Sequence, residues 1–405
     1  MIVRTAGARL MMPYPPSRLL PAVTISLPVT VFGITALSVP LALAAALKLS
    51  AAATADWIAA LYGLSAICSV GLVLWYRQPL LVAWSISGTA LAATLVGQAS
   101  YAELRGAVLV AGVLTMLFGW LGLSERLSRW LPKAIVMALV SGAVLPYVTG
   151  MFISWPEAPL AIGGAFAAYI VGRRFLPLKA TAALPAMLVG LAGAAASGKL
   201  QVSALHWAPP VLAFAPPAFS WTVLVAFAPV LAILVTVTSN LVSVVYVRGE
   251  GYRPSAVAVD TVTGAATIAG SFFGLTPICM ASFLVAPTAG SEAGGHDVRH
   301  WSVYFSSVGL AGIALLSGTA AVLLGVVPTA VLLALAGLAL AGVLLNTLTD
   351  ALRGPLTWGP LVTFAAAASN MSYLGFGSLF WGLVLGTATS LILERKELTS
   401  LRGAS

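Results

Sequence analysis

The stretch PLLVAWSISGT, residues 79–89, decides how this chain is expected to fold, and PICMASFLVAP, residues 277–287, repeats its pattern. In each stretch a proline opens an apolar run of four or five residues, too short to span a bilayer, and a serine follows. Proline is favoured at the first residue of a strand, and serine is favoured at a helix N-cap. Each stretch therefore predicts a half-strand that leads into a half-helix.

The composition places these stretches in a membrane protein. Of the 405 residues, 60% are hydrophobic and 8% are charged, and the mean hydropathy is +1.02. Soluble domains carry about a quarter charged residues. Irregular backbone at membrane depth is tolerated only where protein buries it or where it lines a cavity, so the two stretches mark a candidate binding site.

The long apolar runs divide into fourteen predicted segments, which makes the chain an all-α polytopic membrane protein. The broken stretches are the third and the tenth segments. The predicted segments are 20–47, 56–75, 79–97, 104–122, 132–153, 158–174, 182–197, 219–247, 256–273, 277–290, 301–323, 327–348, 356–373 and 377–393.

The distribution of basic residues predicts the orientation. If the N-terminus is cytoplasmic, the predicted cytoplasmic side receives all of the 20 Lys and Arg residues except Lys48, Arg105 and Lys199. Cytoplasmic loops of membrane proteins collect such residues. The sequence therefore predicts a multi-pass protein of the cell (inner) membrane with both termini cytoplasmic. The net charge of +9 then reflects topology and indicates no nucleic-acid partner.

Seven segments precede a proline-rich connection near residues 209–217, and seven follow it. Because seven is odd, the second half begins on the opposite side of the membrane, and a repeat of the halves must be inverted. The two half-helices would then point their N-termini at each other near the midplane. Each N-terminus carries partial positive charge and unpaired amides, so the gap between them suits an anion.

Four small residues begin the predicted half-helices: Ser85, Ser87 and Gly88 in the first, and Ser282 in the second. Their hydroxyls and exposed amides could hold a carboxylate. The alternative is that they cap helices and allow close packing, as small residues do in membranes. The break in the helices favours the binding interpretation.

A polar stripe and two aromatic residues add further candidates. Within 219–247, Ser239 and Asn240 belong to a stripe, together with Thr236 and Ser243, that is predicted to share one helical face. Asn240 would orient a substrate or, alternatively, form a hydrogen bond between helices. Phe32 and Trp84 could flank a flat organic substrate, whereas aromatic residues in membranes often serve only packing.

No Asp or Glu falls at the centre of a predicted segment, and Asp260 is the deepest, about one helical turn into its segment. Asp260 is either a solvated residue at the end of a helix or a proton-coupling candidate. Paired carboxylates, a Ser–His arrangement and metal ligands are all missing from the segments, so we predict no enzyme activity, no cofactor and no metal site. Cys68 and Cys279 are both predicted to be core residues.

Four patches together resemble the benzoate/proton symporter (BenE-type) family, which is related to the uracil permease and sulfate permease superfamily. They are PLLVAWSISGTAL (79–91), Asn240 with Gly251 and Tyr252, Glu292-Ala293 with Asp297, Arg299 and Trp301, and GSLFWGL (377–383). The chain departs from the family pattern at Ser87, where a proline is expected, and at the bulky Phe283 and the extra Pro287 of the second half-helix.

The resemblance implies two inverted repeats of seven segments and two domains that move against each other. The core domain would comprise 19–123 and 216–325, the gate domain 124–215 and 326–395, with cytoplasmic tails at 1–18 and 396–405. Substrate would lie between the third and tenth segments. The substrate-binding set is then Ser85, Ser87, Gly88, Trp84, Phe32, Ser239, Asn240, Ala281 and Ser282.

The predicted function is secondary active transport of a small organic anion by alternating access, with benzoate or a related aromatic carboxylate as the substrate and a proton as the coupling ion. An inorganic-anion or nucleobase carrier is the alternative within transport, although a nucleobase would favour a carboxylate on the eighth or tenth segment. A non-transporting membrane scaffold or receptor is the alternative from another class. The oligomeric state stays open, a homodimer included.

Overall fold

The structure is a computed structural model, and it describes residues 15–123, 132–176, 182–200, 209–281, 284–369, 371–373 and 376–403. Helices make up most of these residues, and the strands are short. The elements of the first half are α1 (Pro16–Ala36), α2 (Ser38–Ala46), α3 (Ala51–Tyr76), β1 (Val82–Trp84), α4 (Ile86–Ala93), α5 (Tyr101–Trp120), α7 (Lys133–Ile153), η2 (Trp155–Glu157), α8 (Pro159–Phe175) and α9 (Ala183–Ala196).

The second half has the same general order of long helices around a short strand. Its elements are α10 (Trp221–Ile233), η5 (Leu234–Leu241), α11 (Val242–Gly249), α12 (Ala256–Gly270), β2 (Ile278–Met280), α13 (Val285–Ala289), η6 (Ser291–Ala293), α14 (His300–Leu315), α15 (Ser317–Val326), α16 (Thr329–Leu352), α17 (Trp358–Ala368), β3 (Ser372–Tyr373), β4 (Phe376–Gly377), α18 (Ser378–Leu393) and α19 (Arg395–Gly403).

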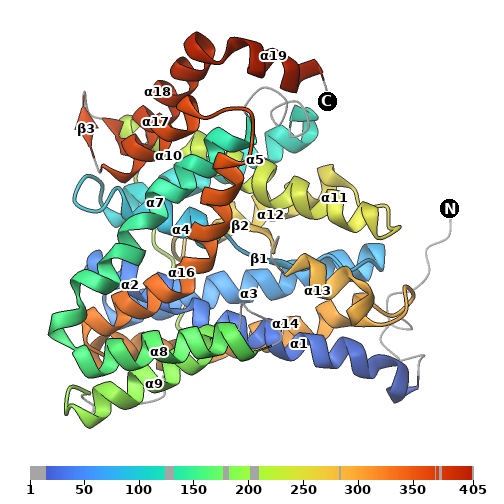
Figure 1. The fold of residues 1–405 in the computed structure, drawn as a ribbon. Coiled ribbons are helices and arrows are strands. Elements are labelled where there is room, and N and C mark those ends of the chain that lie inside the picture. Colours follow the sequence, from blue (N-terminus) through green and yellow to red (C-terminus); the bar gives the residue numbers. More distant parts are fainter. Residues whose placement is uncertain are drawn as a thin grey trace.

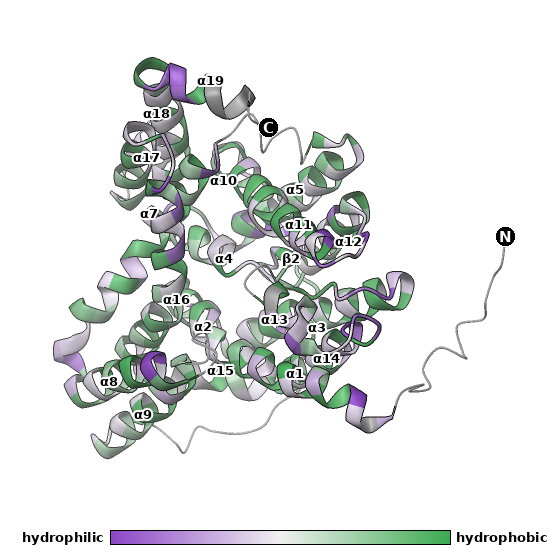
Figure 2. Ribbon diagram, turned by 45° about the vertical axis from the view of Figure 1, so that its right-hand side comes forward, coloured by the Kyte–Doolittle hydropathy of each residue, from purple (hydrophilic) through white to green (hydrophobic). Residues whose placement is uncertain are grey.

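Each of the fourteen predicted segments coincides in position with one or more of these elements. Within the described residues, six helical stretches are long and apolar enough to cross a membrane: 17–46, 51–76, 101–120, 133–157, 221–249 and 329–352. Apolar residues dominate the helices in Figure 2, and the most polar segments lie at helix ends and in α19. The chain is therefore a multi-pass, mainly helical membrane protein.

The helices pack into two groups. In the first group α12 packs along α5, and α14 packs along α1 and α3. In the second group α16 packs along α7, α8 along α9, and α17 along both α18 and α7. Figure 2 shows the second group on the left and the first on the right, and α4 and β2 lie between them. The two short strands thus sit near the boundary between the groups.

Small residues allow the closest helix contacts within the first group. A Cβ added to Gly264 of α12 would come within 2.7 Å of the Gly112 carbonyl oxygen of α5, and one added to Gly112 within 2.8 Å of the Gly264 oxygen. Helices in membranes gain stability from such close packing, because burial of apolar surface gives no advantage over lipid. The contact holds α5 and α12 as one unit beside the strands.

Candidate functional site

The strands β1 and β2 pair with each other near the centre of the molecule, between α4 and α13 (Figure 1). They are antiparallel, although about two hundred residues separate them along the chain. The register places Val82 opposite Met280, Ala83 opposite Cys279 and Trp84 opposite Ile278. The predicted half-strands are therefore present, and each supplies the hydrogen-bonding partners that the other needs at this depth.

Each strand is also held by one hydroxyl from the helix that precedes it. Ser69 of α3 accepts a hydrogen bond from the Val82 N–H at 2.8 Å and donates to the Val82 carbonyl at 3.0 Å. Thr267 of α12 accepts from the Ile278 N–H at 2.9 Å. Val82 and Ile278 are the first residues of their strands, so the two hydroxyls occupy corresponding positions.

The two prolines do not occupy corresponding positions. Backbone bonds run from the Ser85 N–H to the Pro277 carbonyl at 2.7 Å and from the Ala281 N–H to the Leu81 carbonyl at 3.0 Å. Leu81 is thus the counterpart of Pro277, and Pro79 lies two residues earlier. The shared proline pattern located both strands, but it does not align them, because strand pairing and not proline sets the register.

The first half-helix, α4, begins as predicted. Ser85 is its N-cap, and the Ser85 hydroxyl accepts a hydrogen bond from the Gly88 N–H at 2.9 Å. The first N–H groups of a helix have no partner within it, so those of Ile86 and Ser87 are left for another acceptor. Gly88 packs against α10, since a Cβ at this position would lie 2.6 Å from Leu231 Cδ1.

The second half-helix, α13, is much shorter than the predicted one. It covers Val285–Ala289, a little over one turn, and contains Pro287. Arg299 holds its C-terminal end, because its Nη1 donates to the Ala289 carbonyl at 2.8 Å and to Glu250 Oε2 at 2.7 Å. Ser282, the predicted start of this helix, lies outside the described residues.

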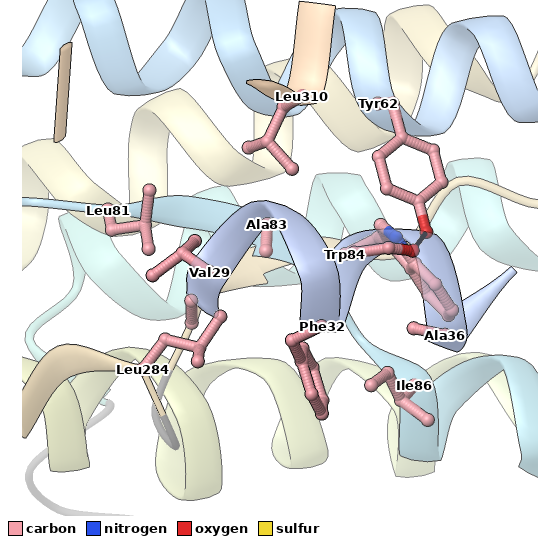
Figure 3. Close-up of a pocket in the computed structure, with 12 residues that line it drawn as sticks. Val29, Phe32, Ala36, Tyr62, Leu81, Ala83, Trp84, Ile86, Leu284 and Leu310 are labelled. Carbon is pink, nitrogen blue, oxygen red and sulfur yellow. Dashed lines mark hydrogen bonds between the residues drawn. The ribbon is translucent and has the colours of Figure 1, made fainter. Parts of the chain in front are cut away.

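A small apolar pocket lies between the strands and α1 (Figure 3). Phe32 and Trp84 line it, as do Leu284 and Leu310. Tyr62 of α3 closes one side, where its ring makes an edge contact with Trp84 at a centroid distance of 5.9 Å and its hydroxyl donates to the Gly33 carbonyl at 2.6 Å. The pocket offers an aromatic wall with no charge.

A larger cavity of about 550 Å³ adjoins this pocket and lies between the two groups of helices. Ligand pockets typically measure about 300–1,000 Å³. The cavity reaches from Ser85 and Ser87 at the start of α4 to Lys133, Arg173 and Asp350 on α7, α8 and α16. The residues that line both spaces are Phe32, Ala36, Trp84, Ile86 and Ala281.

The structure brings most of the predicted site residues to this cavity. The ones that line it are Phe32, Trp84, Ser85, Ser87, Ser239 and Ala281. Gly88 and Asn240 are not among its lining residues. Their predicted role in direct substrate contact stays a prediction, and their observed contacts are with α10 and α12 respectively.

The stripe that carries Ser239 and Asn240 does not form one face of an α-helix. Residues Leu234–Leu241 form the π-helix η5 inside an otherwise continuous helical stretch. Such π-segments are frequent at functional sites. Ser239 lines the cavity, whereas the Asn240 side chain turns toward α12, so the prediction of a single polar face is wrong.

Asn240 connects Asp260 to strand β2. Its Nδ2 donates to Asp260 Oδ1 at 2.8 Å and to Thr263 Oγ1 at 2.9 Å, and its Oδ1 accepts from the Met280 N–H at 2.8 Å. Both Asn240 and Asp260 are 1% exposed. The interpretation of Asp260 as a solvated end residue is therefore wrong, because packing of α5 and α12 encloses it.

Sequence reasoning missed residues that act through tertiary contacts. Cys279, the central residue of β2, lines the cavity, and the hydroxyls of Ser85 and Ser239 lie within hydrogen-bonding reach of its thiol. Asp56, in α3, is 5% exposed and accepts backbone hydrogen bonds from residues 211–213 in the connection between the halves. Only spatial neighbours distinguish these residues from ordinary core positions.

The fold resembles that of solved anion transporters. A structure of SLC26A9 matches with a TM-score of 0.58 and 14% identity over 94% of this chain and 66% of that chain. Murine Slc26a9, described as an anion transporter in the inward-facing state, matches with a TM-score of 0.60 and 15% identity over 97% and 71%. The transmembrane domain of the cyanobacterial bicarbonate transporter BicA matches with a TM-score of 0.55 and 18% identity over 94% and 98%.

Two curated relatives are closer in sequence. The benzoate membrane transport protein of Acinetobacter baylyi is 27% identical over 350 residues, which cover 84% of this chain and 87% of the relative. The inner membrane protein YdcO of Escherichia coli is 26% identical over 345 residues, which cover 84% and 86%. The model of the benzoate membrane transport protein family, BenE, matches residues 17–392. The chain therefore belongs to the BenE family of membrane transport proteins, and it is a transporter and not an enzyme.

Proposed function

We propose that this protein is a secondary active transporter that moves benzoate or a related aromatic carboxylate across the inner membrane by alternating access, together with a proton. One observation carries the proposal: an uncharged aromatic pocket adjoins a cavity that begins at the N-terminus of α4. An aromatic carboxylate has the matching chemistry, with an apolar ring at one end and an anion at the other. The names of the relatives support the same substrate and membrane.

The proposed frame has fourteen membrane segments in two inverted repeats. The antiparallel pairing of β1 with β2 and the corresponding hydroxyls of Ser69 and Thr267 support it. The first group of helices would be the core domain and the second group the gate domain. Because both strands belong to the core, the binding site would move as one body past the gate.

The carboxylate would lie at the start of α4. The first N–H groups of α4, those of Ile86 and Ser87, have no partner within the helix and point along its axis toward its start, and Ser87 lines the cavity. The positive end of the helix dipole stabilises an anion in this position, typically by about 0.3–1 kcal/mol and more where the site is partly buried. Ser85 would fix these amides by capping the helix, which is a positioning role.

The ring would contact Phe32 and Trp84 at the apolar pocket. Aromatic side chains prefer edge-to-face or offset contacts, which add about 0.5–1.5 kcal/mol to the burial of area. Trp84 is held for such a contact by Tyr62, and Tyr62 by its bond to Gly33. Cys279 on β2 and Ala281 just after the strand would form the opposite wall, where small side chains leave room for the ring.

Proton coupling would use Asp260. Its carboxylate is buried, and Asn240 connects it to the backbone of β2. A proton on Asp260 therefore changes the hydrogen bonds that Asn240 can form with Asp260 and Met280. In this proposal Asn240 is a positioning residue that links protonation on α12 to the wall of the substrate site. Buried ionisable residues in membranes usually serve such pathways.

The test is uptake of labelled benzoate into proteoliposomes, with and without a proton gradient. We expect labelled benzoate to accumulate in a manner that depends on the proton gradient. Unlabelled benzoate should compete for this uptake, whereas uracil, sulfate and bicarbonate should compete weakly. Liposomes that contain the Phe32→Ala variant should bind benzoate less tightly and retain the fold. Uptake of an inorganic anion or a nucleobase instead of benzoate would favour a carrier for that solute. No uptake of any of these solutes would favour a scaffold or receptor.

A further inference from the structure

The far end of the large cavity is chemically different from the end at α4. Three charged side chains line it, and all come from the second group of helices: Lys133 at the start of α7, Arg173 near the end of α8 and Asp350 near the end of α16. No other charged residue lines the cavity in the described part of the chain. This end therefore sets the electrostatic potential that an anion meets inside.

Two of the three charges neutralise each other. Lys133 Nζ lies 2.7 Å from Asp350 Oδ2, and both side chains are partly exposed. Arg173 is half-buried, and among the described residues no carboxylate lies within salt-bridge distance of it. The net charge of this end is therefore +1, and the guanidinium of Arg173 supplies it.

Neutral polar groups surround this charge. Tyr169 lies one helical turn before Arg173 on the same helix and lines the cavity, and Asn346 and Thr347 of α16 line it as well. Arginine presents a planar set of donors that matches a carboxylate, and an amide adds a further donor. The arrangement offers one cation and several hydrogen-bond donors, with the only acid already paired.

We propose that Arg173 and Asn346 form a second, gate-side site for the carboxylate of the transported anion, with Tyr169 beside it. The inference rests on the proposed function. The cavity volume of about 550 Å³ leaves room for an anion at this end that does not occupy the α4 end. Because the site belongs to the gate helices, it faces the substrate only while the cavity is open on this side.

The experiment compares neighbouring residues on α8. Arg173→Gln removes the charge that lines the cavity, whereas Arg174→Gln removes an equally basic but exposed charge that does not line it. In proteoliposomes of defined orientation, we expect Arg173→Gln to raise the benzoate KM about fivefold on the side to which the cavity opens, the effect of one hydrated charge contact. The kcat should change little, and Arg174→Gln should match the wild type.

A third variant reverses the sign. Asp350→Asn leaves Lys133 unneutralised and adds one positive charge to the cavity, so it should lower the benzoate KM and steepen its dependence on salt. Equal KM values for Arg173→Gln and Arg174→Gln in a transporting protein would overturn the gate-side site but not the proposed function. A rise in KM for Asp350→Asn would also overturn it, because loss of structure and not charge would then explain both variants. Absence of benzoate transport by the wild type would refute both proposals.

Discussion

The two broken stretches begin alike and end differently. Strands β1 and β2 each have three residues, pair with each other and are held by one hydroxyl from the preceding helix. Beyond the strands, α4 runs for eight residues with a capped N-terminus, whereas α13 covers five. The halves thus share the geometry of the paired strands, but they differ in the helix that follows each strand and in the groups that this helix offers to a ligand.

The difference points to a division of labour. The β1 half supplies the helix amides and the aromatic residue Trp84 that suit an anion with a ring. The β2 half supplies a strand whose Met280 N–H is held by Asn240, which in turn contacts the buried Asp260. We expect variants in the first half to change affinity for the anion. Variants behind β2 should change its coupling to protons and, where they loosen the strand, its affinity as well.

The largest effect is expected from Asp260→Asn, which cannot take up a proton. A pH gradient of one unit stores about 1.4 kcal/mol per proton and supports about tenfold accumulation in a one-to-one symporter. The variant should lose this accumulation and keep exchange of labelled for unlabelled benzoate. Glu292→Gln, which changes an exposed carboxylate, is the control. Normal accumulation by Asp260→Asn would break the proposed division.

Asn240→Ala should affect both affinity and stability. It leaves the Met280 N–H without its acceptor, and a buried group that loses its partner costs about 1–3 kcal/mol. We expect a higher benzoate KM because β2 is less well fixed, and a lower Tm in detergent. Thr263→Val removes only one of the acceptors of Asn240 and should have a smaller effect. A change in Tm with an unchanged KM would confine Asn240 to a structural role.

Ser69→Ala and Thr267→Val test the resemblance between the halves. Each removes the hydroxyl that accepts from the first N–H of a strand, so each should lower the free energy of unfolding by about 1–3 kcal/mol. Thermal unfolding in the same detergent measures both. If the Tm of one variant is far below that of the other, the two hydroxyls do not stabilise their strands equally.

The smallest effect on transport is expected from Glu394→Gln, at a distance from both strands. Burial would raise the pKa of Glu394, but hydrogen bonds from the N–H groups of Thr357, Trp358 and Gly359 and from the Ser390 hydroxyl outweigh it and hold the pKa below its usual range. The carboxylate therefore stabilises the fold above the ordinary glutamate pKa, and this contribution is lost as the pH falls through the lowered value.

The measurement for this variant is Tm as a function of pH. The wild type should lose thermal stability between about pH 5 and the lowered pKa, and Glu394→Gln should start lower and lose less over that interval. Its benzoate KM should equal that of the wild type. A changed KM would mean that the α17–α18 region acts on the site, and the comparison of the two strands would then be incomplete.

The sequence predicted the elements better than their contacts. Proline, a short apolar run and serine located both half-strands, because these local preferences act within a few residues. The bond from Ser69 to Val82 and the position of Cys279 at the cavity depend on how distant helices pack, which no local pattern encodes. Periodicity also assumed an ordinary α-helix where η5 occurs, so Asn240 was expected beside Ser239 and not toward α12.

The two hydroxyls that hold the strands have a consequence for how such a protein can evolve. Ser69 and Thr267 form hydrogen bonds with the strand backbone, and they line neither the pocket nor the cavity. Side chains on the cavity wall, such as Ser87 and Cys279, are thus free to be exchanged while the strand pair keeps its shape. A related protein can therefore change its substrate through a few substitutions on that wall, while the strand pair and the helices that hold it stay the same.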